Sequence, residues 1–176
     1  MTTPTNIKVL ALDVDGVLTD GTISFSTGTK KESKSFHVHD GMGITLWQKA
    51  GNHVILISGR NSDCVALRAT ELNIHHVYQG SKNKIADLEA ALELIGATQA
   101  QTCFVGDDLG DLPIMQHVNY SIAVGNAVQE VKSEANYTTA ALGGHGAVRE
   151  AIEHLMKASG EWSAVVDSCN TETVQQ

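Results

Sequence analysis

Short apolar segments alternate along this chain with segments of helical periodicity. The clearest apolar segments are residues 7–13, 53–58 and 102–106, whose β-branched and apolar residues predict buried strands. Residues 75–78 and 120–124 are shorter candidates for the same sheet. Strands alternating with helices form βαβ units, so we expect an α/β fold: a three-layer, Rossmann-like parallel sheet with helices on both faces. The helices expected between the strands span residues 41–50, 61–72, 82–95, 110–117, 127–133 and 146–158.

One segment interrupts this alternation directly after the first strand. Residues 19–37 contain two short alternating runs around a turn rich in Gly, Thr and Lys, which predicts an inserted β-hairpin. With 176 residues, 42% of them apolar, the chain has enough material for one sizeable core and too little for two ordinary domains. We therefore expect a single domain over residues 1–160, followed by a flexible C-terminal tail at 161–176.

The charge balance restricts the kinds of partner that the chain can bind. Its net charge is −8, from 20 acidic and 12 basic residues, which argues against nucleic acid or a membrane surface because both are polyanionic. The hairpin lysines Lys30, Lys31 and Lys34 are interpreted as a solvated face. Three cysteines lie far apart without a CxxC pair, which indicates reduced thiols and a cytoplasmic location. The longest apolar stretches have the length of a strand and are too short for a membrane span.

Polar side chains follow each main strand at the edge of the sheet where open α/β folds bind ligands. Because the carboxyl ends of parallel strands meet at one edge, we expect these side chains to gather there. They are Asp13 and Asp15 after the first strand, Ser58 and Arg60 after the second, Lys84 at the start of a helix, and Asp107, Asp108 and Asp111 after the third.

This set of residues has the composition needed for phosphoryl transfer. Gathered carboxylates repel one another unless a cation compensates, and all-oxygen ligands suit Mg²⁺. A carboxylate can attack phosphorus to form an aspartyl-phosphate, while Mg²⁺, Lys84 and the Ser58 hydroxyl neutralise the transferring oxygens. The DVDGV motif alone also fits a simple turn or a calcium loop. The ordered series DVDGV, SGR, Lys and GDDxxD is far more specific.

The ordered series resembles the haloacid dehalogenase (HAD) phosphohydrolases over residues 7 to about 155. The resemblance implies that Asp13 is the nucleophile and a magnesium ligand. It also implies that Asp15 is the general acid/base, whose backbone carbonyl contacts the metal, and that Asp107 completes the metal site. A raised pKa is expected for Asp15, because it must hold a proton when the leaving group departs.

The remaining members of the series have phosphate-binding or supporting roles by the same resemblance. Ser58 and Lys84 would be the catalytic hydroxyl and ammonium, with Asp108 and Asp111 as supporting residues. Most HAD enzymes carry a cap domain that selects substrates, but here the gaps between motifs hold only a hairpin and single helices. An enzyme without a cap must use a partner subunit or accept a large substrate.

A narrower resemblance extends over nearly the whole chain except the last fifteen or so residues. The segments ALDVDGVLTDG, FHVHDGMGI, ISGR, YQGSKNK, GDDLGDLP and GGHGAVRE are similar to 3-deoxy-D-manno-octulosonate 8-phosphate (KDO 8-phosphate) phosphatases, which are uncapped HAD enzymes. This resemblance implies a homotetramer in which the hairpin builds the interface and a neighbour covers the active site. It also implies hydrolysis of KDO 8-phosphate to KDO and phosphate, on the route to lipopolysaccharide.

The same resemblance implies a set of substrate contacts. Two arginines near a sugar acid that carries a carboxylate and a phosphate are electrostatically reasonable. The sequence departs from the family at His39, Thr45 and His145, where arginine is found in family members, and this leaves the exact sugar acid open. The implied contacts are Asp15, His37, Val38, His39, Asp40, Gly41, Arg60, Arg68 and Lys84.

Three alternatives to this function remain at the level of sequence. One is a phosphatase for a nine-carbon sugar acid 9-phosphate, either KDN or sialic acid. Another is an uncapped protein or nucleotide phosphatase, which the missing cap would permit. The last is a binding module that has lost catalysis, and the presence of both Asp13 and Asp15 argues against it.

Overall fold

Within the described residues, six parallel strands form the central sheet in the order β5–β4–β1–β6–β7–β8. The structure is a computed structural model and describes residues 4, 6–29 and 31–172. The expected parallel sheet is confirmed, and β8 is a two-residue edge strand that the sequence did not predict. The strands are β1 (Val9–Leu12), β4 (His53–Ser58), β5 (His76–Gln79), β6 (Thr102–Gly106), β7 (Tyr120–Ala123) and β8 (Tyr137–Thr138).

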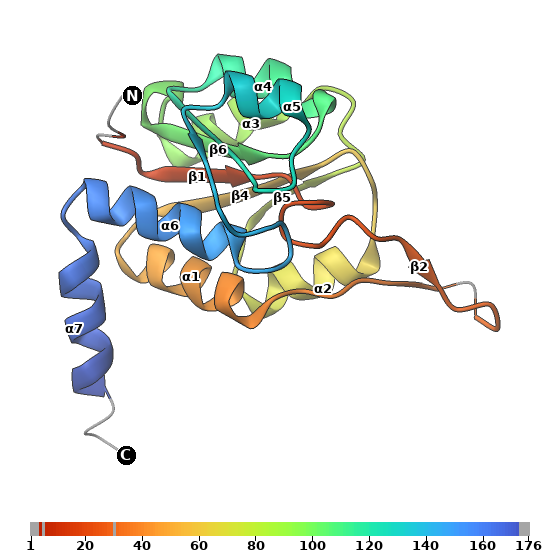
Figure 1. The fold of residues 1–176 in the computed structure, drawn as a ribbon, viewed down its shortest axis with the longest axis horizontal. Helices are drawn as coiled ribbons and strands as arrows, with labels where there is room; N and C mark the ends of the chain where they lie inside the picture. Colours follow the sequence, from red (N-terminus) through yellow and green to blue (C-terminus); the bar gives the residue numbers. More distant parts are fainter. Residues whose placement is uncertain (1–3, 5, 30, 173–176) are drawn as a thin grey trace.

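Helices cover both faces of the sheet, which confirms the three-layer architecture (Figure 1). One layer contains α3 (Lys84–Ile95), α4 (Leu112–His117) and α5 (Gln129–Glu134). The opposite layer contains α1 (Val38–Lys49), α2 (Asp63–Glu71) and α6 (Ala147–Ala158). No helix among residues 6–29 and 31–172 combines the length and the apolar character required to cross a membrane.

Strand β1 lies at the centre of the sheet and sets the position of the functional edge. Its four residues have no exposed surface, because β4 and β6 pair with it on either side and helices cover both faces. The chain runs from β1 to β4 and β5 on one side, and then crosses to β6, β7 and β8 on the other. The topological switch point therefore lies at the carboxyl end of β1, where Asp13 follows.

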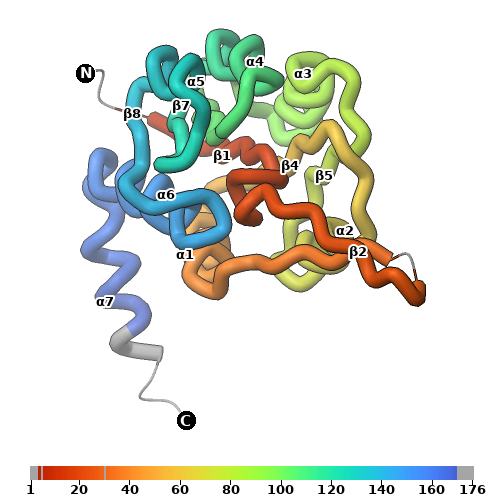
Figure 2. The backbone as a smooth tube through the Cα atoms, turned by 45° about the vertical axis from the view of Figure 1, so that its right-hand side comes forward, coloured from red at the N-terminus to blue at the C-terminus, as the bar shows by residue number. Residues whose placement is uncertain are grey.

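A two-stranded hairpin projects from this body, as predicted (Figures 1 and 2). It pairs β2 (Ser24–Phe25) with β3 (Glu32–Ser33) in antiparallel fashion. Phe25 is 63% exposed and Ile23 is 44% exposed, so the hairpin presents apolar side chains to solvent. Among the described residues, only this hairpin and α1 separate β1 from β4, and this part of the chain contains no cap domain.

The segment that was expected to be an irregular tail contains a helix, α7 (Trp162–Glu172). Its first residue, Trp162, lies beneath the Arg149 guanidinium at 5.1 Å and the Lys157 ammonium at 5.6 Å, both from α6. Glu161 also pairs with Lys8 at 3.3 Å. The contacts with Lys8 and Arg149 join segments that are distant in the sequence, and local periodicity does not reveal such contacts. The last four residues lie outside the described part of the chain.

Asp40 connects α1 to the N-terminus of α6. Its Oδ1 accepts a hydrogen bond from the Arg149 backbone N–H at 2.8 Å, and its Oδ2 accepts one from the Gly146 N–H at 3.3 Å. The first N–H groups of a helix have no intrahelical partner, so a carboxylate placed there stabilises the helix. Burial raises the pKa of Asp40, while these backbone hydrogen bonds oppose the shift. Asp40 therefore has a structural role, and its predicted contact with substrate stays a prediction.

Replacing Asp40 with alanine is expected to lower the free energy of unfolding by about 1–3 kcal/mol, because the N–H groups that it satisfies would be left buried and unpaired. Chemical denaturation measures this change. Glu93→Ala, exposed in the last turn of α3, is the control and should change stability by less than about 0.5 kcal/mol. Equal stability of the two variants would show that the hydrogen bonds between Asp40 and the N-terminus of α6 do not stabilise the fold.

Candidate active site

Three carboxylates meet at the carboxyl edge of the sheet. Asp13 follows β1, Asp107 follows the adjacent strand β6, and Asp111 ends the 3₁₀ turn η2 (Leu109–Asp111). Oxygen atoms of the three side chains all lie within 4.8 Å of one another. The parallel pairing of β1 with β6 places the first two side by side, and η2 folds back to bring the third. Asp111, predicted only as a supporting residue, is thus a full member of the cluster.

Lys84 partly balances the charge of this cluster. It is the first residue of α3, which Asn83 caps by accepting a hydrogen bond from the Ala86 N–H at 3.2 Å. The Lys84 Nζ lies 2.7 Å from Asp13 Oδ1 and 2.7 Å from Asp111 Oδ1. Burial disfavours the charged ammonium, but the two carboxylates outweigh this effect and raise the pKa of Lys84. Lys84 therefore remains a cation at neutral pH.

One ammonium does not compensate three acids. Burial and the neighbouring charge of Asp111 raise the pKa of Asp13 to about 6, although Lys84 opposes the shift. Burial and the charges of Asp13, Asp111 and Asp108 raise the pKa of Asp107 to about 7. Without a further cation, the cluster thus holds protons close to neutral pH.

The surroundings of Asp107 fit a hard divalent cation. Its Oδ1 is a buried acceptor with no hydrogen-bond partner, although buried polar atoms are normally satisfied. A Cβ on Gly16, whose φ is +95°, would lie 2.1 Å from Asp107 Oδ2, so only glycine lets the loop after β1 approach this carboxylate. Carboxylate oxygens gathered in this way are the ligands that Mg²⁺ prefers. Asp13 and Asp107 lie where they could hold it, together with the Asp15 backbone carbonyl, and these ligand roles stay predictions.

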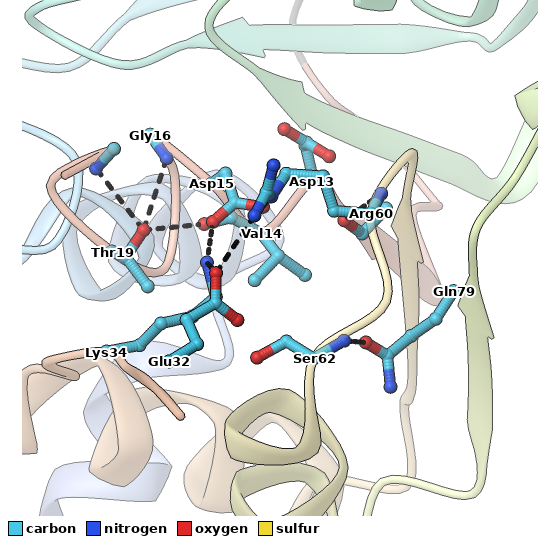
Figure 3. A network of polar contacts seen from close by, with 12 residues as sticks. Asp13, Val14, Asp15, Gly16, Thr19, Glu32, Lys34, Arg60, Ser62 and Gln79 are labelled. Atoms are coloured by element: carbon cyan, nitrogen blue, oxygen red, sulfur yellow. Dashed lines mark hydrogen bonds and ion pairs between the residues drawn. The ribbon is translucent and has the colours of Figure 1, made fainter. Parts of the chain in front are cut away.

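Asp15 lies in a second network of charges (Figure 3). The Lys34 Nζ contacts Asp15 Oδ1, and the Arg60 Nε lies 3.8 Å from Asp15 Oδ2. Glu32 Oε1 bridges the two cations, at 3.4 Å from Lys34 Nζ and 3.0 Å from Arg60 Nη2. The interpretation of Lys34 as part of a solvated face was wrong, because its side chain has 0% exposure.

Ser58 ends β4 and is buried. Its hydroxyl oxygen accepts a hydrogen bond from the Arg60 backbone N–H at 3.1 Å, and its carbonyl oxygen accepts one from the Ser81 N–H at 3.0 Å. The second bond joins the end of β4 to the loop that leads to Lys84. Ser58 thus lies at the predicted edge, and its contact with phosphate stays a prediction.

The glycine-rich loop before α6 packs against the loop after β1 of the same chain. A Cβ on Gly143 would lie 1.6 Å from the Gly16 carbonyl oxygen, so a side chain there is sterically impossible without movement. The Gly144 N–H also donates to the Val17 carbonyl oxygen at 2.9 Å. This contact supports the backbone that directly follows Asp15.

The other predicted site residues lie on α1, α2 and η2. Asp108 begins η2, where its Oδ1 accepts a hydrogen bond from the Leu109 N–H at 2.8 Å. Arg68 pairs with Glu71 at 2.9 Å, and its Nη2 lies 3.5 Å from the His37 carbonyl oxygen. Gly41 is buried, and a Cβ at this position would clash with the Arg68 guanidinium. Val38 and His39 are exposed, and the His37 Nδ1 is buried without a partner. Their contacts with substrate stay predictions.

Two charged residues of the Asp15 network, Glu32 and Lys34, were missed by sequence reasoning. A signal was present, since residues two apart on a strand point to the same side. Glu32 and Lys34 have that spacing and carry opposite charges, so they could either form ion pairs with other residues or face solvent. The sequence pattern does not show that they lie beside Asp15 and Arg60, which follow other strands.

The fold and this site define a class of hydrolase. The family described as haloacid dehalogenase-like hydrolase has a sequence model that matches residues 57–152. That range includes Ser58, Lys84 and the Asp107–Asp111 cluster, while Asp13 precedes it.

Three similar proteins narrow the class to a family. The 3-deoxy-D-manno-octulosonate 8-phosphate phosphatase KdsC of Salmonella typhi is 40% identical over 161 residues, which cover 92% of this chain and 85% of the relative. The crystal structure of the Moraxella catarrhalis phosphatase, in complex with magnesium ion, phosphate ion and a KDO molecule, matches with a TM-score of 0.90 and 34% identity, over 94% of this chain and 95% of that one. The cobalt-bound Haemophilus influenzae phosphatase matches with a TM-score of 0.86 and 35% identity, over 90% and 92%. The chain belongs to the family of 3-deoxy-D-manno-octulosonate 8-phosphate phosphatases.

The raised pKa values of the cluster predict how the effect of Mg²⁺ depends on pH. The folded metal-free protein binds protons on Asp13 and Asp107 more tightly than the unfolded chain, so their contribution to stability is lost as pH rises from the ordinary aspartate value of 3.8 through about 6 to 7. Mg²⁺ competes with these protons. We expect the gain in melting temperature on adding MgCl₂ to increase from about pH 5 to about pH 8.

Differential scanning fluorimetry with MgCl₂ or EDTA measures this gain. Asp107→Asn removes one charged ligand and is expected to reduce both the gain and its dependence on pH. If MgCl₂ raises the melting temperature of the wild type by the same amount at about pH 5 and at about pH 8, a metal site formed by these carboxylates is contradicted.

Proposed function

We propose that this protein is a magnesium-dependent phosphatase that hydrolyses KDO 8-phosphate to KDO and inorganic phosphate through an aspartyl-phosphate at Asp13. The observation that carries the proposal is the cluster of Asp13, Asp107 and Asp111 around Lys84, at the switch point of the sheet. The named activity of the relatives agrees with this chemistry.

The first half of the proposed reaction transfers the phosphoryl group to the protein. A carboxylate oxygen of Asp13 forms a bond to phosphorus while the bond between phosphorus and the sugar oxygen breaks. The bonding electrons pass to the sugar oxygen, which takes a proton from the Asp15 carboxyl group. KDO leaves as the neutral alcohol at that position.

The second half returns the protein to its starting state. Water attacks phosphorus, the Asp15 carboxylate accepts the proton of the water, and the bond between phosphorus and Asp13 breaks. Lys84 lies close enough to Asp13 to neutralise the oxygens of the group in transfer, and the Ser58 hydroxyl would bind one of them. Mg²⁺, when bound by Asp13, Asp107 and the Asp15 backbone carbonyl, supplies further positive charge to the phosphoryl oxygens.

Recognition of the sugar acid is proposed to involve Arg60, Arg68 and the segment 37–41. Arg60 lies beside Asp15, so it can meet a ligand that reaches the acid/base. His39, Thr45 and His145 replace arginines found in family members, which keeps a nine-carbon sugar acid 9-phosphate as the competing substrate. The named activity of the relatives favours the eight-carbon substrate.

Phosphate release from KDO 8-phosphate and from KDN 9-phosphate, each with MgCl₂ or with EDTA, tests the proposal. We expect turnover of KDO 8-phosphate with magnesium and at least about a tenfold lower kcat/KM for the nine-carbon substrate, a discrimination that corresponds to about 1.4 kcal/mol. Asp13→Asn keeps the shape of the side chain, removes the nucleophile and is expected to abolish turnover.

The outcomes separate the chemistry from the substrate. Cleavage of generic aryl phosphates without cleavage of KDO 8-phosphate would retain the aspartyl-phosphate mechanism and reject the substrate. Activity of Asp13→Asn near that of the wild type would reject the mechanism itself.

We also propose that the protein is a homotetramer assembled through its hairpin, with a neighbour closing the site that lacks a cap. The exposed side chains of Phe25 and Ile23 support this assembly, because an apolar pair on the first arm of a projecting hairpin gains by burial against another subunit. A cytoplasmic location stays a prediction from the scattered cysteines.

Phe25→Asp is expected to dissociate the oligomer and to lower activity with it, because the charge replaces an apolar contact worth about 1.5–3 kcal/mol for each buried side chain. Size-exclusion chromatography with light scattering measures the mass. Leu94→Asp, on α3 and 75% exposed, is the matched control and should leave the mass unchanged. A fully active monomeric Phe25→Asp variant would contradict a site shared between subunits.

A further inference from the structure

Lys34 is unusual among the charged residues of the hairpin. The segment from Asp20 to Thr29 is exposed throughout, yet the Lys34 side chain has 0% exposure. A buried ammonium is costly unless carboxylates pair with it. Lys34 satisfies this condition by pairing with Asp15 and Glu32. Its ammonium group therefore contacts the carboxyl group of the proposed acid/base and is not exposed to solvent.

The contacts constrain the Asp15 carboxyl group from two directions (Figure 3). Lys34 contacts Oδ1 and the Arg60 Nε lies 3.8 Å from Oδ2, so each oxygen has its own cation. Glu32 holds both cations in place through its Oε1. The four side chains alternate in charge and come from the loop after β1, the hairpin and the loop after β4.

We propose that Lys34 is a positioning residue for the reaction: it fixes the orientation of the Asp15 carboxyl group toward the oxygen of the leaving group. The proposal rests on the acid/base role that the proposed function gives to Asp15. A general acid must lie within hydrogen-bond reach of the atom that it protonates, and a displacement of about 1 Å can cost about 100-fold in rate. A carboxyl group on a loop keeps that accuracy only if other side chains restrain it.

If Lys34 positions Asp15, the effect of its loss depends on the acidity of the leaving group. If Lys34 only stabilises the fold, the effect does not depend on the leaving group. An acidic phenol departs without protonation, whereas a weakly acidic one needs the proton from Asp15. Loss of Lys34 should therefore slow phenyl phosphate more than 4-nitrophenyl phosphate. A variant that is partly unfolded would lose the same fraction of activity with both substrates.

Lys34→Met tests this statement with the full-length protein, magnesium and the two aryl phosphates, together with KDO 8-phosphate. We expect kcat/KM, which covers the steps up to departure of the leaving group, to fall about 10- to 100-fold for phenyl phosphate and less than about threefold for 4-nitrophenyl phosphate. The later attack of water on the aspartyl-phosphate is the same for both substrates and does not enter kcat/KM. For KDO 8-phosphate, kcat should fall while KM changes little. Lys34→Arg keeps a cation at this position and is expected to restore most of the rate.

Two further variants complete the experiment. Lys132→Met removes a lysine of α5, outside both the hairpin and the Asp15 network, and should leave all three rates unchanged. Asp15→Asn removes the acid itself and should show the strongest dependence on the leaving group. Should Lys34→Met be insoluble, Glu32→Gln weakens the same network and is expected to shift the rates in the same direction by a smaller factor.

The outcomes decide between the two hypotheses. If Asp15→Asn depends on the leaving group and the network variants do not, the role of Lys34 is rejected and the proposed function stands. If Asp15→Asn lowers kcat/KM for both aryl phosphates by the same factor, the general-acid role fails and the inference fails with it. A rise in KM for KDO 8-phosphate with unchanged kcat would make Lys34 a substrate contact and would also overturn the proposal.

Discussion

The active site depends on the ion pairs that Lys84 forms with two buried carboxylates. Asp13 and Asp111 reach the same ammonium from different segments of the chain, each at 2.7 Å. Parallel pairing of β1 with β6 brings acids together, and without Lys84 their repulsion would oppose the approach of the loops that carry them. The remaining excess of negative charge raises the pKa values of Asp13 and Asp107 and leaves one Asp107 oxygen unpartnered. The cluster is thereby suited to a divalent cation.

The two aspartates of the DVDGV motif lie in different electrostatic surroundings although one residue separates them. Asp13 contacts Lys84 and lies among other carboxylates, whereas Asp15 pairs with Lys34 and Arg60 in the network of Figure 3. Enzymes that need a nucleophile and an acid/base commonly give similar side chains different neighbours. Gly16 and Gly143 maintain this arrangement, because the loop after β1 lies against Asp107 on one side and the glycine-rich loop on the other.

Much of the fold and of the central site was predictable from the sequence. Strands such as 53–58 have strong local patterns, and the end of a parallel strand has a known position, so Asp13, Asp107 and Lys84 could be expected together. Residues whose role comes from distant contacts could not be assigned in this way. The pattern does not show that Asp40 caps α6, that Trp162 lies beneath cations of α6, or that Lys34 contacts Asp15.

The sequence by itself determined the alternation of strands and helices, the edge at which the acids gather and the kind of chemistry that they permit. These follow from periodicity and from residue types at strand ends, which are local properties. Only the tertiary structure decided which charges pair. The hairpin folds back so that Lys34, interpreted from its neighbours as solvated, is buried against Asp15. The reason is physical: burial and ion pairing depend on what approaches from elsewhere in the chain, and a pattern of nearby residues does not contain that information.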